Sequence, residues 1–224
     1  MSTIRTKAII LSRTNYGEAD RIMNILTPDN GKLSVIAKGV RREKSKLAGG
    51  IELLAISELT LHQGKGNLAI VTSARLDTFF AHILEDYAKL QFIYYVLKDI
   101  SKAAEALSEP EFYEILRIVL ESLNSKTIDS RIIETWYRLQ MAILLGVGIN
   151  LSTDDNGMKL IEDTTYRFDV ESMSFAYDAK GQYETDHIKL LRVMSAQPPA
   201  IVSQVSRAKE LIQQCATIGK IAHE

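Results

Sequence analysis

The pattern of the first 75 residues restricts the fold of this chain more than any other feature. Five short segments there carry the β-branched residues or the alternation of apolar and polar residues that is typical of strands. Turn residues separate them: Asn30-Gly31 can adopt the positive φ values of a tight hairpin, and Gly64-Lys65-Gly66 can form another turn. Strands are expected at about 3–12, 20–26, 32–38, 53–62 and 67–75. So many short strands in so few residues favour a small closed barrel, most commonly an OB fold, although other small barrels also fit.

Residues 31–46 form a strongly basic stretch within this region, with six basic side chains against one acid, Glu43. Its first half alternates like a strand, so that one face can enter a core while the other carries charge. After Gly39 the alternation stops, and the residues that follow are too polar and too alike in charge to be buried. We therefore expect an exposed basic loop that meets an anionic partner. The basic residues of the stretch are Lys32, Lys38, Arg41, Arg42, Lys44 and Lys46.

The formal net charge of −1 hides a division of charge along the chain. Residues 1–75 hold 12 Lys and Arg against 6 Asp and Glu, whereas the remainder holds 15 against 22. This division indicates an N-terminal part that meets a polyanion, although a charge run is often only a solvated face. Tyr16 is the only aromatic residue in this part, so we expect salt-sensitive binding through phosphates with little sequence preference.

From about residue 76 the pattern becomes helical. One segment, 92–97, is apolar on more than one face, which indicates a helix packed between the barrel and other helices. Helices are expected at about 86–104, 108–123, 129–145, 186–195 and 201–218, with a short β-hairpin at 165–177. The expected fold class is therefore α+β, with a barrel domain at 1–80 and an α-helical domain at 81–224.

Motifs for catalysis or metal binding are missing from the sequence. There is no phosphate-binding glycine loop of the P-loop type, and the four histidines are scattered without metal-ligand spacing. The single cysteine, Cys215, excludes an internal disulfide and a cysteine-based zinc module, and its apolar neighbours predict a buried structural thiol. We therefore expect no enzymatic activity, no cofactor and no metal. The longest early apolar run, 8–11, is too short for a signal peptide or membrane span, so we expect a cytoplasmic protein without membrane contact.

Four pieces of the N-terminal sequence together resemble the N-terminus of the RecO family of bacterial recombination mediators. They are Ala8-Ile9-Ile10-Leu11, Tyr16-Gly17-Glu18-Ala19-Asp20-Arg21-Ile22, Leu26-Thr27-Pro28-Asp29-Asn30-Gly31-Lys32 and Ala37-Lys38-Gly39-Val40-Arg41-Arg42-Glu43-Lys44-Ser45-Lys46-Leu47. Their order and spacing match the family, and the combination is far more specific than any one piece. The resemblance covers about residues 4–80, whereas the helical remainder resembles the family in layout only.

The resemblance implies an N-terminal five-stranded OB-fold barrel followed by an α-helical domain, in a protein of DNA repair and homologous recombination without enzymatic turnover. Such proteins bind single- and double-stranded DNA and anneal complementary strands in the RecFOR pathway. They work with RecR to load RecA onto DNA coated by single-strand-binding protein, whose acidic C-terminal tail they contact, so that RecA is an indirect partner. A location in the bacterial cytoplasm at the nucleoid follows.

The resemblance also assigns residues to the DNA-facing side of the barrel. The main candidates are Lys38, Arg41, Arg42, Lys44 and Lys46, with Lys32, Arg13 and Arg21 in support. Tyr16 and the glycines of the motif are given roles in shaping the turns.

The chain departs from the family in one region. Many RecO proteins carry a four-cysteine zinc module after the third helix of the helical domain, but residues 150–184 contain no cysteine. We expect this insert to bind no zinc and its hairpin to be held by apolar side chains. The ones we expect to hold it are Tyr166, Phe168, Val170, Phe175 and Tyr177.

Three other functions stay open on sequence grounds. The first is a protein–protein adaptor whose barrel no longer binds DNA strongly, which weak, salt-insensitive DNA binding would identify. The second is a hydrolase or nucleotide-dependent enzyme, which a lack of turnover or metal dependence would exclude. The third is binding of RNA in place of DNA, since a basic barrel face distinguishes them poorly without contacts to the 2′-hydroxyl.

Overall fold

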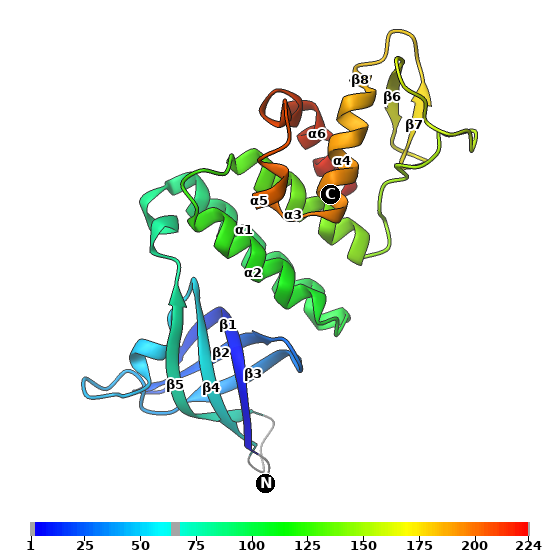
Figure 1. The fold of residues 1–224 in the computed structure, drawn as a ribbon. Helices are drawn as coiled ribbons and strands as arrows, with labels where there is room; N and C mark the ends of the chain where they lie inside the picture. The colour runs from blue at the N-terminus through cyan, green and yellow to red at the C-terminus, as the bar shows by residue number, and fades with distance from the viewer. Residues whose placement is uncertain (1–2, 64–67, 224) are drawn as a thin grey trace. The chain divides into compact units, whose positions relative to one another are not determined.

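The computed structural model describes residues 3–63 and 68–223, and the chain divides into two compact units, Met1–Asn124 and Ser125–Glu224. The first unit contains a β-barrel, two α-helices and two short 3₁₀ helices among its described residues, and the second contains helices and a small sheet (Figure 1). The boundary predicted at residue 80 separates the barrel strands from the helices that follow them. As a boundary between domains it remains a prediction. Within the described ranges, no helix combines the length and the apolar character needed to cross a membrane.

The barrel is closed and has the strand order β1-β2-β3-β5-β4. Its strands are β1 (Thr3–Tyr16), β2 (Asp20–Thr27), β3 (Gly31–Ala37), β4 (Ala55–His62) and β5 (Ala69–Phe79). Neighbouring strands are antiparallel except for β3 and β5, which are parallel. This is the arrangement of an OB fold, so the predicted barrel is confirmed. The turn predicted at 64–67 lies outside the described residues.

The barrel core follows the alternation seen in the sequence. In β3, Val35 and Ala37 are fully buried while Ser34, next to Val35, is exposed. In β1, by contrast, every residue of 8–11 is buried, and a register shift between Ile10 and Ser12 interrupts the pairing with β2. A strand that is buried on both faces needs a cover outside the barrel as well as a core inside it.

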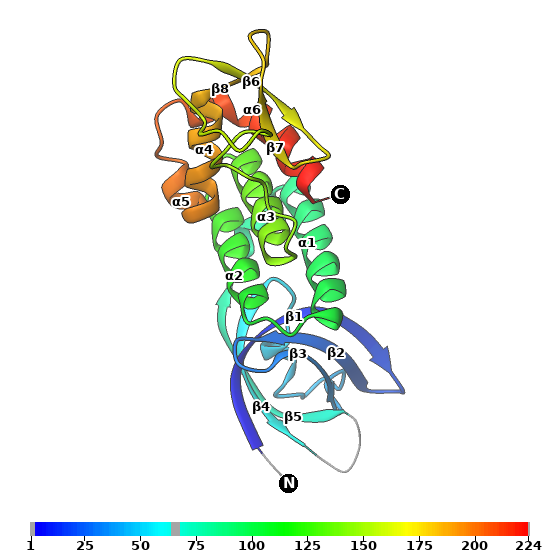
Figure 2. The same cartoon turned by 90° about the vertical axis from the view of Figure 1, so that its right-hand side faces the viewer.

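The helix α1 (Tyr87–Ala106) supplies this cover. Figure 2 shows it near β1 and β3, and it contacts both of these strands and α2 (Glu111–Asn124). Its N-terminus is capped by Asp86, whose carboxylate accepts hydrogen bonds from the backbone amides of Ala88 and Lys89 at 2.9 and 3.2 Å. These contacts confirm that the helix packs against both the barrel and another helix, whereas Tyr94 and Tyr95 of the segment 92–97 are exposed. A short 3₁₀ helix, η2 (Ala81–Glu85), connects the barrel to α1.

The second unit is built from four helices and a three-stranded sheet of order β7-β6-β8. Its elements are α3 (Ser130–Leu144), β6 (Thr165–Asp169), β7 (Ser174–Tyr177), β8 (Tyr183–Glu184), α4 (Thr185–Ala196), α5 (Pro199–Val202) and α6 (Ala208–Ala222). The predicted hairpin is confirmed, because β6 and β7 pair in register. The single helix predicted at 201–218 is wrong: the chain leaves the helix after α5, and Arg207 adopts a left-handed conformation with φ of 61° before α6 begins.

Aromatic contacts fill the hairpin of the second unit. Phe175 is fully buried and makes edge contacts with Tyr166, Phe168 and Tyr183, at ring-centroid distances of 6.4, 5.4 and 5.7 Å. Val170 and Tyr177, which we had also expected to hold the hairpin, are exposed. The described residues bring together no group of three or more His, Cys, Asp or Glu side chains that could hold a metal ion.

Cys215 of α6 is fully buried, as its apolar neighbours predicted. Burial raises the pKa of its thiol to about 12, and the sulfur lies 3.7 Å from the carbonyl oxygen of His187. A thiol with so high a pKa is protonated at neutral pH and is a poor nucleophile. This is a structural cysteine.

The 3₁₀ helix η1 (Ala48–Gly50) packs on β5 so closely that Gly50 has no room for a side chain. A Cβ at Gly50 would lie 2.5 Å from the backbone carbon and oxygen of Ala74, whereas a Cβ at Gly49 would meet nothing within 4 Å. Backbone atoms of a closed barrel cannot yield as a flexible side chain does.

We expect Gly50→Ala to destabilise the barrel by about 1–3 kcal/mol, because the added methyl group must push η1 away from β5. Gly49→Ala is the matched control and should change stability by less than about 1 kcal/mol. Urea unfolding followed by circular dichroism measures both. Equal unfolding midpoints for the two variants would contradict this packing.

Candidate nucleic-acid interface

The basic loop, defined here as residues 38–46, projects from the barrel between two residues that pack on the barrel core. Val40 is buried in the barrel core at the start of the loop, and Leu47 packs against the same core just after it. Ile51 is fully buried and returns the chain to the barrel. Figure 1 shows the loop in light blue at the side of the barrel, where it extends away from the strands.

The base of the basic loop is held by the turn between β1 and β2. The carboxylate of Asp20 accepts a hydrogen bond from the amide of Gly39 at 2.7 Å, and the carbonyl of Ala19 accepts one from the amide of Arg41 at 2.9 Å. The guanidinium of Arg41 also donates to the carbonyl of Gly17 at 3.4 Å. Gly39 has φ of 64°, a conformation that most residues with a side chain avoid. The turn between β1 and β2 and the start of the basic loop, which are separate in the sequence, are therefore joined by hydrogen bonds.

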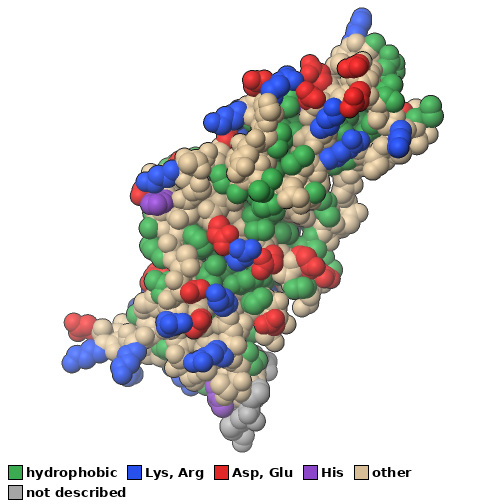
Figure 3. Space-filling model, viewed as in Figure 1, with side chains coloured by type: hydrophobic (Ala, Val, Ile, Leu, Met, Phe, Trp, Pro, Cys, Tyr) green, Lys and Arg blue, Asp and Glu red, His purple; other side chains and the backbone are tan. Residues whose placement is uncertain are grey.

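The cations of the basic loop are exposed and unpaired. Within 3–63 and 68–223, none of its lysines or arginines forms an ion pair, and Glu43 is the only acid in the loop. Other barrel cations are neutralised: Lys7 pairs with Asp77 at 2.9 Å and Arg75 with Glu58 at 2.8 Å. The excess positive charge therefore gathers on the loop, where Figure 3 shows a group of Lys and Arg side chains on a projection. The exposed cations are Lys38, Arg41, Arg42, Lys44 and Lys46.

Of the supporting candidates, Arg21 lies closest to the basic loop. It stands opposite Ala37 in the pairing of β2 with β3, and its Nε donates to the side-chain oxygen of Asn15 at 3.2 Å. Arg13 lies farther along β1, and its Nη1 donates to the carbonyl of Ile51 and the carboxylate of Glu52, both at 3.0 Å. Arg21 thus keeps its full charge beside the loop, whereas the charge of Arg13 is partly compensated.

Lys32 makes a different contact from the one expected of a DNA-facing residue. It lies at the start of β3, about 20 Å from the loop at the rise of an extended strand, and its side chain is only 9% exposed. Its ammonium donates to the carbonyl of Ser101 at 2.8 Å and to the carboxylate of Glu105 at 2.5 Å. These bonds join β3 to α1, and the hydrogen bond from Lys32 lowers the pKa of Glu105. We leave Lys32 out of the interface, because its ammonium contacts α1. Strand alternation alone could not show that a helix covers this face.

Sequence reasoning missed the role of Asp20. This residue was part of the motif that we matched, but its partner amide is 19 residues away, and no local pattern connects the two. A tight β-turn followed much later by a glycine-containing basic stretch was the only signal available.

Comparison with known proteins shows which sequences this chain is similar to. Residues 1–80 match the family model described as "Recombination protein O N terminal". The chain is 31% identical over 169 residues to a DNA repair protein RecO of Dehalococcoides mccartyi, a match that covers 75% of this chain and 66% of the relative. It is 44% identical over 89 residues to the RecO of Heliobacterium modesticaldum, covering 40% of this chain and 32% of the relative. For the RecO of a Thermoanaerobacter species the identity is 30% over 147 residues, covering 65% and 59%. Each match therefore spans less than two thirds of the relative's length.

We expect Asp20→Ala to loosen the base of the basic loop, because the amide of Gly39 loses a charge-assisted hydrogen bond. Such a bond contributes about 1.5–3 kcal/mol, so that opening of the loop should rise on the order of tenfold or more. Limited trypsin digestion measures this, since the loop offers several Lys and Arg cleavage sites. Asp29→Ala removes the same carboxylate from an exposed turn and should be cut at the wild-type rate. Equal cleavage rates for the two variants would show that Asp20 does not hold the loop.

We expect Lys32→Ala to lower the melting temperature without changing the salt dependence of DNA binding, because its ammonium contacts α1 and not solvent. The folded-state pKa of Glu105 is lowered, so its contribution to stability is present above its ordinary pKa of 4.5 and is lost as the pH falls below it. The difference in melting temperature between variant and wild type should therefore shrink in acid. A smaller salt slope at unchanged stability would place Lys32 in the interface after all.

Proposed function

Because this chain belongs to the RecO family of DNA repair proteins, we propose that it is a DNA-binding recombination mediator that holds strands on its basic loop. The observation that carries the proposal is the group of exposed, unpaired cations on a loop anchored at both ends to an OB barrel. Its role is in DNA repair and homologous recombination. The proposal includes annealing of complementary strands without enzymatic turnover.

The geometry suits contact with phosphates more than reading of bases. Each cation that neutralises a phosphate releases a counterion, which favours binding of any sequence. Two complementary strands repel each other as polyanions, and a projecting loop that neutralises both lowers this repulsion. Tyr16 is exposed on the turn that holds the loop and offers a ring to an unpaired base. Binding of this kind tolerates any sequence, as annealing requires.

The proposed partners follow from the family and not from a contact in this chain. They are single- and double-stranded DNA, RecR, and the C-terminal tail of single-strand-binding protein, with RecA loaded indirectly. The protein would act in the bacterial cytoplasm at the nucleoid, with neither cofactor nor zinc.

The second unit favours an additional role in protein binding. Its small sheet and the segment before it expose several large apolar side chains, which are more costly in water than polar ones. They are Met158, Ile161, Val170 and Tyr177. This observation keeps the adaptor function as the second candidate, in which the barrel binds DNA weakly and the helical part holds proteins.

Fluorescence anisotropy of a labelled single-stranded oligonucleotide across a salt series tests the proposal. The loop variant changes four side chains to Ala: Arg41, Arg42, Lys44 and Lys46. We expect it to lose most of its affinity, and its logarithmic salt slope to shrink by about 0.7 for each phosphate that the variant no longer neutralises.

The charge-matched control changes four exposed basic side chains of the second unit to Ala: Lys159, Arg167, Lys180 and Lys209. It should bind with nearly the wild-type slope. If the loop variant also kept its affinity and slope, the basic loop would not be the DNA site. If wild-type binding were itself weak and insensitive to salt, the adaptor function would take its place.

A further inference from the structure

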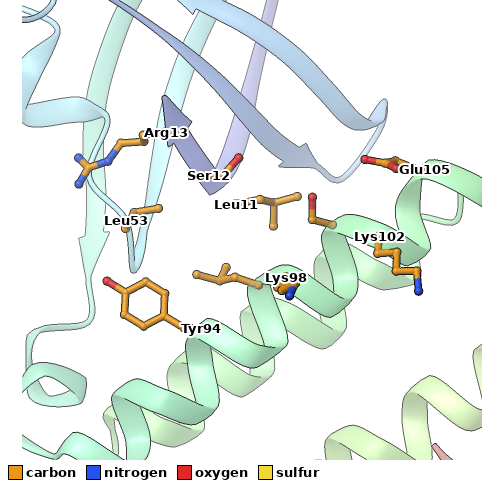
Figure 4. Close-up of a pocket in the computed structure, with 10 residues that line it drawn as sticks. Leu11, Ser12, Arg13, Leu53, Tyr94, Lys98, Lys102 and Glu105 are labelled. Carbon is orange, nitrogen blue, oxygen red and sulfur yellow. The ribbon is translucent and has the colours of Figure 1, made fainter. Parts of the chain in front are cut away.

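A groove between β1 and α1, both in the first unit, combines an exposed aromatic ring with lysine side chains. It has a volume of about 540 Å³, within the range of pockets that hold small ligands, about 300–1,000 Å³. Figure 4 shows residues of the barrel on one side and residues of α1 on the other. The groove is not part of the basic loop described above.

The floor of the groove is apolar and an aromatic ring stands at one end. The floor is lined by three leucines: Leu11 of β1, Leu53 from the segment before β4, and Leu97 of α1. Tyr94 of α1 lies across from Leu53, with 49% of its surface exposed. An exposed ring beside an apolar floor is a surface on which a flat, planar group can stack. Among residues 1–75 the only aromatic residue is Tyr16, so Tyr94 of α1 adds a further ring to the surface of the first unit.

The electrostatics of the groove favour an anion. Lys98 and Lys102 stand one turn apart on α1, and neither ammonium has an ion-pair or hydrogen-bond partner among residues 3–63 and 68–223. Glu105 is the acid of the groove, and its charge is compensated by Lys32. The groove therefore carries net positive charge beside an exposed ring.

The end of the groove at Arg13 lies on β1, the strand that leads into the turn that holds the basic loop. Arg13 lines one end of the groove and donates a hydrogen bond to the carbonyl of Ile51, the residue at which the loop segment returns to the barrel. An extended polymer bound to the loop can continue along the surface of the first unit into the groove. This continuity favours an extended polyanion over a small anion or a separate acidic peptide.

We propose that the groove binds a segment of single-stranded nucleic acid, with a base stacked on Tyr94 and phosphates at Lys98 and Lys102. The combination of an aromatic platform with unpaired cations is the one that proteins use to hold single strands without reading their sequence. Bases inside a duplex cannot reach the ring, so the groove discriminates single from double strands. The inference rests on the proposed function, because it extends the strand path that begins at the basic loop.

Binding of single- and double-stranded oligonucleotides to Tyr94→Ala, Tyr94→Phe and wild type tests the stacking contact. Tyr94→Ala should weaken single-strand binding about 5- to 100-fold and leave duplex binding unchanged, and Tyr94→Phe should keep the affinity because it keeps the ring. Tyr177→Ala removes an exposed tyrosine from the second unit and is the matched control.

The cations are tested by a double variant, Lys98→Ala with Lys102→Ala. Its salt slope on single strands should shrink by about 1.4, which corresponds to two neutralised phosphates. The control with Lys180→Ala and Lys209→Ala should keep the wild-type slope. As a readout that does not depend on a folded variant, an oligonucleotide with 5-iododeoxyuridine should crosslink to Tyr94 of the wild-type protein on irradiation, as mapped by mass spectrometry.

The outcomes separate this inference from the proposed function. If the loop variant loses DNA while the groove variants bind single strands as wild type does and no crosslink forms at Tyr94, the groove is not on the strand path and the proposed function still stands. If the wild-type protein binds no DNA at low salt, both fail. If the groove variants lose a labelled peptide of Glu and Phe residues but keep single-strand affinity, the groove is a peptide site and the inference is overturned.

Discussion

The burial of β1 on both faces is the constraint on which the rest of the first unit depends. Residues 8–11 are apolar without alternation, so the inner face of the strand enters the barrel core while the outer face needs a cover. The helix α1 supplies that cover, and Lys32 joins the helix to β3 through Ser101 and Glu105. The barrel is therefore completed by a helix outside it, and that helix carries an aromatic ring and cations to its edge.

The second feature of this unit is the separation of paired and unpaired cations. Ion pairs on the barrel surface, such as Lys7 with Asp77, leave little net field, whereas the basic loop keeps its charge because no acid among the described residues pairs with it. Self-repulsion would tend to splay such a loop. The packing of Val40 and Leu47 on the barrel core and the hydrogen bond from Gly39 to Asp20 fix its ends, so the repulsion extends the loop into solvent without unfolding it.

Aromatic packing holds the small sheet of the second unit, in the region where the resemblance had raised the question of a zinc module. Phe175 lies at the centre of three edge contacts there. The expectation that apolar residues do this was right for Tyr166, Phe168 and Phe175 and wrong for Val170 and Tyr177. Val170 follows the last residue of β6 and Tyr177 is the last residue of β7, and alternation in the sequence does not show where a strand ends. The break before α6 was missed for a related reason, since a left-handed residue such as Arg207 leaves no trace in apolar periodicity.

The sequence by itself determined the five strands of the barrel, the helical character of most of the remainder and the concentration of basic residues after β3, because each depends on residues close together in the chain. Only the tertiary structure decided which cations are free. It buried Lys32 against α1, placed Asp20 under the basic loop and brought Tyr94 beside the barrel. These outcomes depend on pairs of residues 19 to 73 positions apart, or on a helix beyond the barrel. Local propensity carries no information about such contacts, since they form only when the elements pack.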